Sequence, residues 1–303
     1  MRTVVALGGN ALAPGGEATI ADQRERIEET ADELRDLHEA GHDLVVTHGN
    51  GPQVGALLRQ QEESDAPERP LDVLVAETQA QIGYLLQQAL DERIDARVVS
   101  VVTQVEVDPD DSAFDEPSKP VGPYLRGEQA SQRAFETAEV TTSKGETARR
   151  RVVPSPEPAR VVEDERIDSL VADGAPVVCA GGGGVPVAVE AGDITGVEAV
   201  VDKDHTTRLV AERVDADVLV MATDVPCVYA DFGTPEQTPI ENATAPELRE
   251  RLAAGEFGEG SMEPKVQACL AFLDAGGERA VVAGTDAVAA AVAGDAGTQI
   301  RPG

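Results

Sequence analysis

Three glycine-rich segments are the first places in this sequence where the chain could bind an anion. They are Gly8-Gly9-Asn10, Gly49-Asn50-Gly51 and Gly181-Gly182-Gly183, and each follows a short apolar run that is typical of a buried strand. Glycines at the carboxyl end of a strand let backbone N–H groups approach an oxyanion without a Cβ atom in the way. Pro52 suits the first turn of a following helix, whose N-terminus would add a partial positive charge. Together the three loops favour an anion site, whereas one alone would indicate only a turn.

Lysine is rare in this chain, which makes each lysine informative. Only Lys119, Lys144, Lys203 and Lys265 occur, and arginine supplies the rest of the 25 basic residues. The compact ammonium group of lysine binds phosphate as a point charge. The remaining lysines are therefore expected to be enriched where a phosphate is bound. Lys144 lies in a polar run and is interpreted as solvated.

The familiar nucleotide-binding and metal-binding motifs are missing from the sequence. No G-x-x-x-x-G-K-[ST] segment occurs, and Gly49-x-Gly51 lacks the third glycine of a G-x-G-x-x-G loop. A dinucleotide oxidoreductase is therefore disfavoured, although it stays open as an alternative. Cys179, Cys227 and Cys269 form no C-x-x-C pair, which argues against a disulfide scaffold or a thiolate metal site. Each cysteine is expected to be a small core residue.

The elements that must position these residues follow from the pattern of apolar residues. Short β-branched runs predict strands, and the longer amphipathic stretches between them predict helices. The predicted strands are residues 3–7, 43–47, 97–102, 176–180, 217–222 and 279–283, and the predicted helices are residues 21–40, 71–92, 163–173, 205–214 and 264–275. This alternation predicts a fold of the α/β class, an open αβα sandwich with a mainly parallel central sheet.

Two stretches leave alternatives open. Residues 108–158 are rich in Pro, Gly, Ser and charge and show no strong helical or strand core, so they form either an insertion beside the site or a mere surface loop. Residues 71–92 carry a broad apolar stripe, which fits a dimer contact or a core helix equally well. The stripe consists of Leu71, Leu74, Val75, Ile82, Leu85 and Leu86.

Composition restricts the class of partner. Among the 303 residues, 56 are acidic and 25 basic, and the formal net charge of −31 argues against nucleic acid or an anionic membrane as a partner. Salt at about 1 M shortens the Debye length to about 3 Å, so a concentrated salt cytoplasm would screen the self-repulsion. No apolar run approaches the roughly 20 residues of a membrane span, and the N-terminus reads as a strand rather than a signal peptide. We therefore expect a cytoplasmic protein.

Six segments, in order along nearly the whole chain, resemble the carbamate kinase family. They are residues 6–12 (ALGGNAL), 47–55 (THGNGPQVG), 119–123 (KPVGP), 152–158 (VVPSPEP), 202–204 (DKD) and 262–266 (MEPKV). The resemblance implies the amino acid kinase fold, a homodimer, and the reversible reaction of ATP with carbamate to give ADP and carbamoyl phosphate. In the family this reaction often runs toward ATP, as the last step of arginine fermentation.

The resemblance also implies a division of the chain and roles for its residues. Residues 1–204 would form the carbamate lobe, with a protruding subdomain at about 113–158, and residues 205–303 the nucleotide lobe. Lys119 would reach the transferred phosphoryl group, Lys203 and Lys265 would lie near the nucleotide phosphates, and Asp204 would orient the lysines. An ordinary helix cap is the alternative for Asp204. The glycine loops with Asn10 and Asn50 would bind the acid substrate, and the nucleotide would contact Asp224, Val225, Tyr229 and Met262 as well as Lys203 and Lys265.

Several expectations depend on this chemistry. Carbamate is already an anionic nucleophile, so no general base is needed, and His48 and His205 are interpreted as structural or positioning residues. Mg²⁺ would arrive with ATP or ADP and take no ligand from the protein. Asp224 would look the same as a turn residue. The run Arg149-Arg150-Arg151 is expected to affect only the protrusion.

Two alternatives share the fold. Relatives that phosphorylate longer acids, such as acetylglutamate kinases, commonly carry a lysine in the first strand, where this chain has Ala6. That difference favours carbamate, with Lys119 supplying the charge from the insertion. A non-catalytic ligand sensor would keep the glycine loops but could lose the lysines, and here all three are present.

Overall fold

A computed structural model of the chain describes residues 1–303 except residues 13–18, 126–127, 132, 143–144 and 258–261, and it does not describe the side chains of residues 10, 11, 128 and 129. Lys144 and the side chain of Asn10, both assigned from the sequence, lie outside this description. Within the described part, no helix is both long and apolar enough to cross a membrane.

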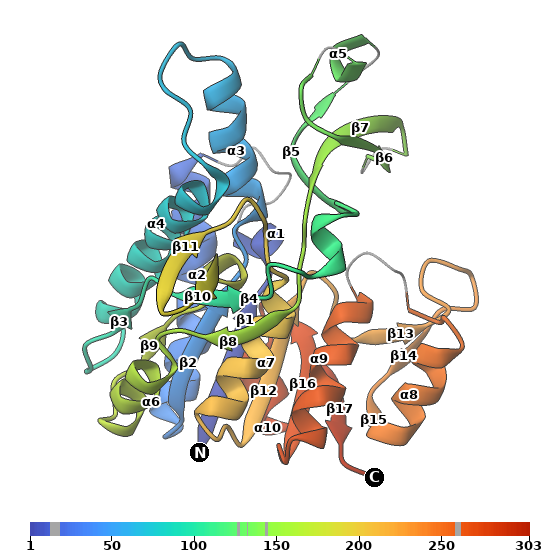
Figure 1. Cartoon of the computed structure of the whole chain (residues 1–303). Coiled ribbons are helices and arrows are strands. Elements are labelled where there is room, and N and C mark those ends of the chain that lie inside the picture. Colours follow the sequence, from blue (N-terminus) through green and yellow to red (C-terminus); the bar gives the residue numbers. More distant parts are fainter. Residues whose placement is uncertain (13–18, 126–127, 132, 143–144, 258–261) are drawn as a thin grey trace.

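One eight-stranded sheet forms the centre of the molecule (Figure 1). Its neighbours pair in parallel, except that β16 and β17 are antiparallel. In spatial order the strands are β15 (Asn242–Thr244), β17 (Thr298–Arg301), β16 (Arg279–Gly284), β12 (Val218–Thr223), β1 (Arg2–Leu7), β2 (Asp43–His48), β9 (Val177–Val178) and β3 (Val99–Ser100). The predicted mainly parallel sheet is confirmed, although the two strands at the β3 edge are shorter than the apolar runs predicted.

Helices bury both faces of this sheet, because alternate strand residues point to opposite sides. Val4 and Ala6 belong to the core beneath one set of helices, and Val5 and Leu7 to the core beneath the other. The first set is α6 (Asp164–Ala172), α7 (Lys203–Arg213), α8 (Ala245–Ala253) and α9 (Met262–Asp274). The second set is α2 (Ile20–Glu39), α4 (Leu71–Asp91) and α10 (Val288–Ala293).

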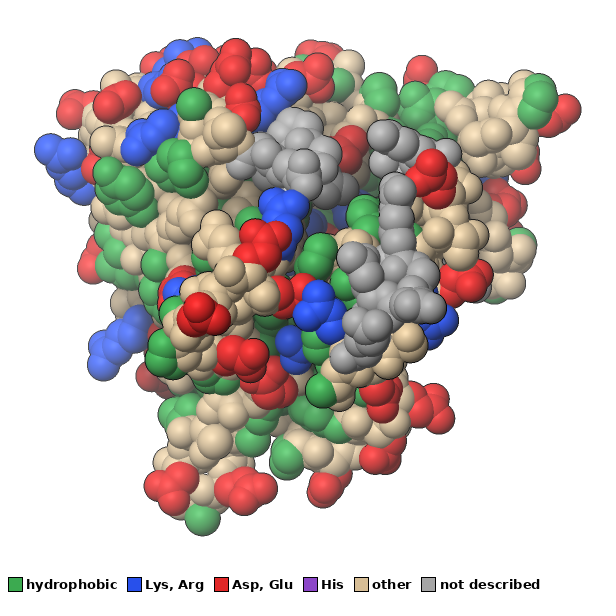
Figure 2. All heavy atoms as spheres, turned by 90° about the horizontal axis from the view of Figure 1, so that it is seen from above, with side chains coloured by type: hydrophobic (Ala, Val, Ile, Leu, Met, Phe, Trp, Pro, Cys, Tyr) green, Lys and Arg blue, Asp and Glu red, His purple; other side chains and the backbone are tan. Residues whose placement is uncertain are grey.

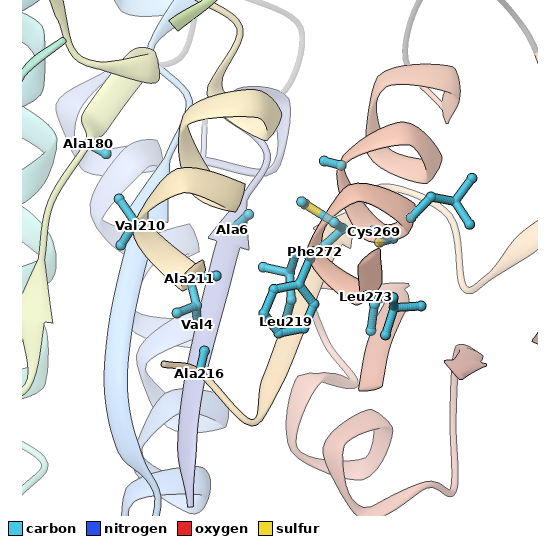
Figure 3. Packing of buried hydrophobic residues seen from close by; sticks show 14 of the residues in the cluster. Val4, Ala6, Ala180, Val210, Ala211, Ala216, Leu219, Cys269, Phe272 and Leu273 are labelled. Carbon is cyan, nitrogen blue, oxygen red and sulfur yellow. The ribbon is translucent and has the colours of Figure 1, made fainter. Parts of the chain in front are cut away.

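The first core packs α7 and α9 directly onto the central strands. Figure 3 shows Ala211 of α7 beside Val4 of β1, and Phe272 of α9 beside Leu219 of β12. Cys179, Cys227 and Cys269 are all buried, as the sequence predicted. The position of α7 and α9 fixes where their first residues, Lys203 and Met262, meet the sheet edge.

The apolar stripe on α4 proves to be core. All six of its residues are at most 4% exposed within the single chain. The outward face of α4 nevertheless carries Val73, which is 38% exposed, and Tyr84, which is 55% exposed. These two residues are eleven positions apart, which places them on the same side of an α-helix.

The expectation that residues 108–158 lack a strand core is wrong. They contain an antiparallel sheet of β5 (Lys119–Leu125), β7 (Thr147–Val153) and β6 (Thr137–Thr141). This sheet projects beyond the carboxyl ends of the central parallel strands (Figure 1). Its strands are half exposed and carry Thr, Glu and Arg on their outer face, so they lack the continuous apolar run of a buried strand. Val121 and Val153 anchor this protruding sheet to Leu58 and Leu71 of the body.

The remaining elements support the site from outside the central sheet. A four-stranded sheet and a short hairpin lie beside it, in the spatial orders β11-β10-β4-β8 and β13-β14. Their bounds are β4 (Gln104–Val107), β8 (Pro158–Val161), β10 (Val185–Glu190), β11 (Asp193–Gly196), β13 (Val228–Ala230) and β14 (Thr238–Ile240). The short helices are α1 (Gly9–Leu12), α3 (Gly51–Glu62), α5 (Glu128–Ser131), and the 3₁₀ turns η2 (Ser112–Phe114) and η3 (Gly181–Gly183).

Candidate active site

The carboxyl ends of the parallel strands open into one large cavity. Its volume is about 2040 Å³, and its wall includes the residues that follow β1, β2, β12 and β16 together with the inner side of the protruding sheet. Open α/β sheets bind ligands at this edge. Figure 2 looks onto this edge, where several Lys and Arg side chains lie near the middle of the face while Asp and Glu dominate its rim.

The first two glycine loops touch each other at the cavity wall. A Cβ atom at Gly49 would lie 2.7 Å from the backbone nitrogen of Gly9, so the two loops can approach this closely only without a side chain. Helix α3 begins at Gly51 with Pro52 in its first turn, as predicted. Gly8, Gly9, Gly49, Asn50 and Gly51 all line the cavity.

The third glycine loop is mostly buried, and only one of its three glycines lines the cavity. Only Gly182 lines the cavity, whereas Gly181 and Gly183 are buried behind it. A Cβ atom at Gly183 would lie 2.4 Å from the carbonyl oxygen of Val201, and its φ of +85° also favours glycine. The carbonyl oxygen of Gly183 accepts a hydrogen bond from Thr206 Oγ1 at 2.8 Å, which ties the loop to α7. Direct substrate contact by Gly181 and Gly183 stays a prediction.

The two histidines near the loops are both engaged. His48 is only 1% exposed, and its Nδ1 lies 3.1 Å from the carbonyl oxygen of Gly49. Burial lowers the pKa of His48 to about 4, so its imidazole is neutral near pH 7. His205 Nδ1 lies 2.8 Å from Glu157 Oε2. Both placements fit the interpretation of these residues as structural.

Asp204 lies between two lysines at the cavity floor. Lys265 Nζ donates to Asp204 Oδ2 at 3.1 Å, and Lys203 Nζ donates to Asp204 Oδ1. Burial alone would raise the pKa of Asp204, but the ammonium groups of Lys203 and Lys265 lower it below its ordinary value. The carboxylate is therefore ionised and holds both ammonium groups in place. The alternative that Asp204 caps the helix is wrong, because the N-cap of α7 is Asp202.

Lys119 reaches the same region from the protruding sheet. Its Nζ lies 2.8 Å from Asp202 Oδ2. Burial tends to raise the pKa of Asp202, but Lys119 and the backbone N–H of Asp204 outweigh it and hold that pKa at about 2. The three ammonium groups and two carboxylates of this lysine cluster (Lys119, Asp202, Lys203, Asp204 and Lys265) leave one net positive charge facing the cavity.

The residues assigned to the nucleotide line the other side of the same cavity. Asp224 and Val225 directly follow β12, Tyr229 lies in β13, and Met262 begins α9. Phe232, which sequence reasoning missed, lies beside Tyr229 with the two ring centroids 5.9 Å apart. The two rings give this end of the cavity an aromatic surface suited to a flat base.

The sequence did not predict that Asp202 and Arg150 line the cavity. Asp202 was noticed only as part of a sequence string. Arg150 lines the cavity, donates from Nε to the carbonyl oxygen of Gly122 at 3.0 Å and lies over the ring of Tyr124. Arg150 of the arginine run therefore belongs to the cavity wall as well as to the protruding sheet. In a strand, residues 149 and 151 face opposite to residue 150, so recognising β7 would have revealed this.

The described carboxylates of the cavity wall are the side chains nearest to any metal ion that enters with a ligand. Among the residues that the structure describes, no group of three or more His, Cys, Asp or Glu side chains could hold one. Both oxygens of Asp204 are already bonded to lysines. Asp224 and Asp286 are further carboxylates in the cavity wall.

Known proteins resemble this chain over nearly its whole length. The sequence profile of the amino acid kinase family matches residues 1–284. A carbamate kinase of Halobacterium salinarum is 51% identical over 301 residues, covering 99% of this chain and 98% of that protein. One from Pyrococcus furiosus is 41% identical over 311 residues, covering 99% of both chains. The structure of a Giardia lamblia carbamate kinase bound to AMP-PNP superposes with a TM-score of 0.90 at 36% identity, covering 100% of this chain and 98% of that chain.

Proposed function

The chain belongs to the amino acid kinase family, and from that premise we propose that it is a carbamate kinase, which transfers a phosphoryl group reversibly between ATP and carbamate. The observation that carries the proposal is the convergence of Lys119, Lys203 and Lys265 on one cavity beside the first two glycine loops. The high identity to carbamate kinases along the full chain supports the same acceptor.

The first strand supports carbamate over a longer acid. Ala6 is fully buried in the core and carries no charge toward the cavity. The position that holds a lysine in the acetylglutamate kinase type therefore contributes no cation here. Lys119 would supply this charge instead, and its position in β5 of the protruding sheet, within the cavity wall, supports that role.

The chemistry asks mainly for charge neutralisation. A carboxylate oxygen of carbamate forms a bond to the γ-phosphorus of ATP, while the bond from that phosphorus to the β–γ bridging oxygen breaks and ADP leaves with the electron pair. Donor, acceptor and transferred group are all anionic, so three fixed ammonium groups stabilise the charge that spreads over the phosphoryl oxygens. No proton has to be removed from carbamate, and the neutral, buried His48 fits that requirement.

The nucleotide occupies the part of the cavity walled by Asp224, Val225, Tyr229 and Met262, which belongs mostly to residues 205–303. Lys203 and Lys265 face its phosphates, and the glycine loops of residues 1–204 face the acceptor. Mg²⁺ enters with the nucleotide, because this ion is usually held by substrate phosphates, water and at most one or two carboxylates. Asp224 of the same wall faces the ribose or the metal-bound phosphates, and the protein supplies no ligand to the metal ion.

The physiological setting is a further part of the proposal. The enzyme works in the cytoplasm, where its nucleotides are, and runs toward ATP as the last step of arginine fermentation. It forms a homodimer through the outward face of α4, where exposed Val73 and Tyr84 share one side of the helix. Tyr84→Glu would place a charge in that contact and should shift the mass measured by light scattering in high salt from dimer to monomer. A parent protein that is already monomeric at micromolar concentration would refute this interface.

The activity is tested by offering carbamoyl phosphate with Mg-ADP at high KCl and measuring ATP with a luciferase assay on diluted samples. We expect ATP to form with carbamoyl phosphate but not with acetyl phosphate, a matched acyl phosphate. A parallel reaction with ATP and N-acetylglutamate tests the alternative acceptor. Phosphorylation of N-acetylglutamate without ATP formation from carbamoyl phosphate would overturn the assignment.

A further inference from the structure

Asp202 joins the two parts of the lysine cluster, and we propose that it is a positioning residue that holds Lys119 of the protruding sheet against the N-terminus of α7. The inference rests on the proposed function, because Lys119 matters only if a phosphoryl group is transferred beside it. In this proposal Asp202 acts through Lys119 and does not touch the substrate.

The two oxygens of Asp202 have different partners. Oδ1 accepts the backbone N–H of Asp204 at 3.0 Å and so caps α7, while Oδ2 accepts Lys119 Nζ at 2.8 Å. The cap fixes the carboxylate to the same helical turn that carries Lys203 and Asp204. A single side chain therefore places Lys119 relative to the other two lysines of the cluster.

Lys119 needs such a partner more than the other lysines do. Its side chain is 41% exposed, whereas the side chains of Lys203 and Lys265 are 12% and 9% exposed. Fixing a lysine side chain costs free energy, because the side chain loses rotamer freedom. Without a partner that fixes it beforehand, this cost would add to the activation free energy of the reaction. The ion pair with Asp202 fixes the ammonium group before the substrate binds.

The ion pair leaves Lys119 able to act. An ammonium group has three N–H donors, and Asp202 takes one, so two remain for phosphoryl oxygens. The low pKa of Asp202, about 2, keeps its carboxylate charged at any pH near neutrality. Asp202 also lies in the wall between the main cavity and a smaller one of about 320 Å³, both of which include Lys119. Neither Lys119 nor Asp202 is therefore sealed in the core.

A double-mutant cycle tests the coupling. Asp202→Asn keeps an oxygen that can cap α7 but removes the charge that holds Lys119. We expect it to lower kcat for ATP formation about tenfold, with the KM for ADP within about twofold of the parent. In a Lys119→Ala background the same substitution should change kcat by less than about twofold, because no ammonium group is left to position.

Controls separate positioning from folding. Glu157→Gln removes a nearby carboxylate that pairs with His205 instead of Lys119, and it should leave kcat within about twofold of the parent. Asp202→Glu keeps the charge and should retain more activity than Asp202→Asn. Asp202→Ser also keeps a capping oxygen without a charge. If thermal unfolding shows that the Asp202→Asn variant does not fold, Asp202→Ser takes its place in the double-mutant cycle.

The outcomes are distinguishable. An equal loss of kcat from Asp202→Asn in both backgrounds, or no loss in the parent, would overturn the positioning role. Absence of ATP formation by the parent enzyme would instead overturn the proposed function on which it rests.

Discussion

At the scale of single residues, we propose that the charge of Lys119 acts in the phosphoryl transfer step more than in nucleotide binding. We predict that Lys119→Ala lowers kcat for ATP formation by about a hundred- to a thousand-fold, because an electrostatic stabiliser of the transition state is lost. The KM for ADP should change far less. Steady-state kinetics with carbamoyl phosphate and Mg-ADP measures both constants. A kcat within about threefold of the parent would show that Lys119 has another purpose.

Lys265→Ala provides the matched comparison. Lys265 is paired with the buried Asp204 and lies in the first turn of α9, where we propose that the nucleotide phosphates bind. Its charge would serve the bound nucleotide in the ground state as well as in the transition state. Part of its loss should therefore be seen as a higher KM for ADP, which Lys119→Ala should not show.

His48 should make the stability of the protein depend on pH. Its pKa is about 4 in the folded chain, against about 6.5 when unfolded, so the unfolded state binds more protons between these values. Stability is therefore lost as the pH falls from about 6.5 to about 4, by roughly 3 kcal/mol in total from this group. We predict that His48→Gln flattens the pH dependence of the free energy of unfolding in this window, measured by thermal unfolding in constant high salt. An unchanged slope would contradict this prediction.

The sequence could indicate the lysines of the site but not all of their partners. Lysine scarcity singled out Lys203 and Lys265, and the resemblance of segments such as 202–204 to the carbamate kinase family implied their roles and that of Asp204. The role of Asp202 could not be predicted, because its partner Lys119 is 83 residues away and reaches it only through the fold of the protruding sheet. Gly181 and Gly183 belong to the same glycine-rich segment as Gly182. The absence of a side chain at these two positions leaves room for the ring of His48 and the carbonyl group of Val201.

At the scale of elements, the contact between the first two glycine loops fixes their backbones relative to each other at the cavity wall. We predict that Gly49→Ala destabilises the protein by about 1–3 kcal/mol, because the new Cβ would push against the backbone of Gly9. Gly51→Ala is the matched control, since no atom lies within 4 Å of a Cβ built there. It should change stability by less than about 0.5 kcal/mol. Thermal unfolding of the two variants compares them, and equal stabilities would contradict the proposed clash.

Elements buried on both faces were predictable, and the half-exposed ones were not. The strands β1, β2, β12 and β16 have continuous Val and Ala runs, which gave their positions within two residues. The strands β5, β6 and β7 alternate buried and exposed residues imperfectly and include Pro120, Gly122 and Pro123. Strand β5 and Val153 of β7 also pack against α3, and a local pattern does not contain contacts between segments so far apart in the sequence.

At the scale of the whole molecule, self-repulsion is the dominant electrostatic effect. The excess of 56 acidic over 25 basic residues cannot be offset by the surface ion pairs, many of which are exposed, such as Arg26–Glu29 with side chains 49% and 60% exposed. We predict that the melting temperature and the activity both rise as KCl is raised from low concentration toward about 1 M, where the Debye length falls to about 3 Å. Full activity and an unchanged melting temperature without added salt would refute this.

The three buried cysteines give the molecule a built-in reporter of this salt dependence. Burial raises the pKa of Cys179 to about 12, so the thiolate that attacks an aromatic disulfide reagent is almost absent while the chain is folded. Cys227 and Cys269 are shielded by the same tertiary structure. The rate of labelling by such a reagent would therefore measure the fraction of molecules that are transiently open. Dilution out of salt should release all three thiols together if the central sheet opens as one cooperative unit.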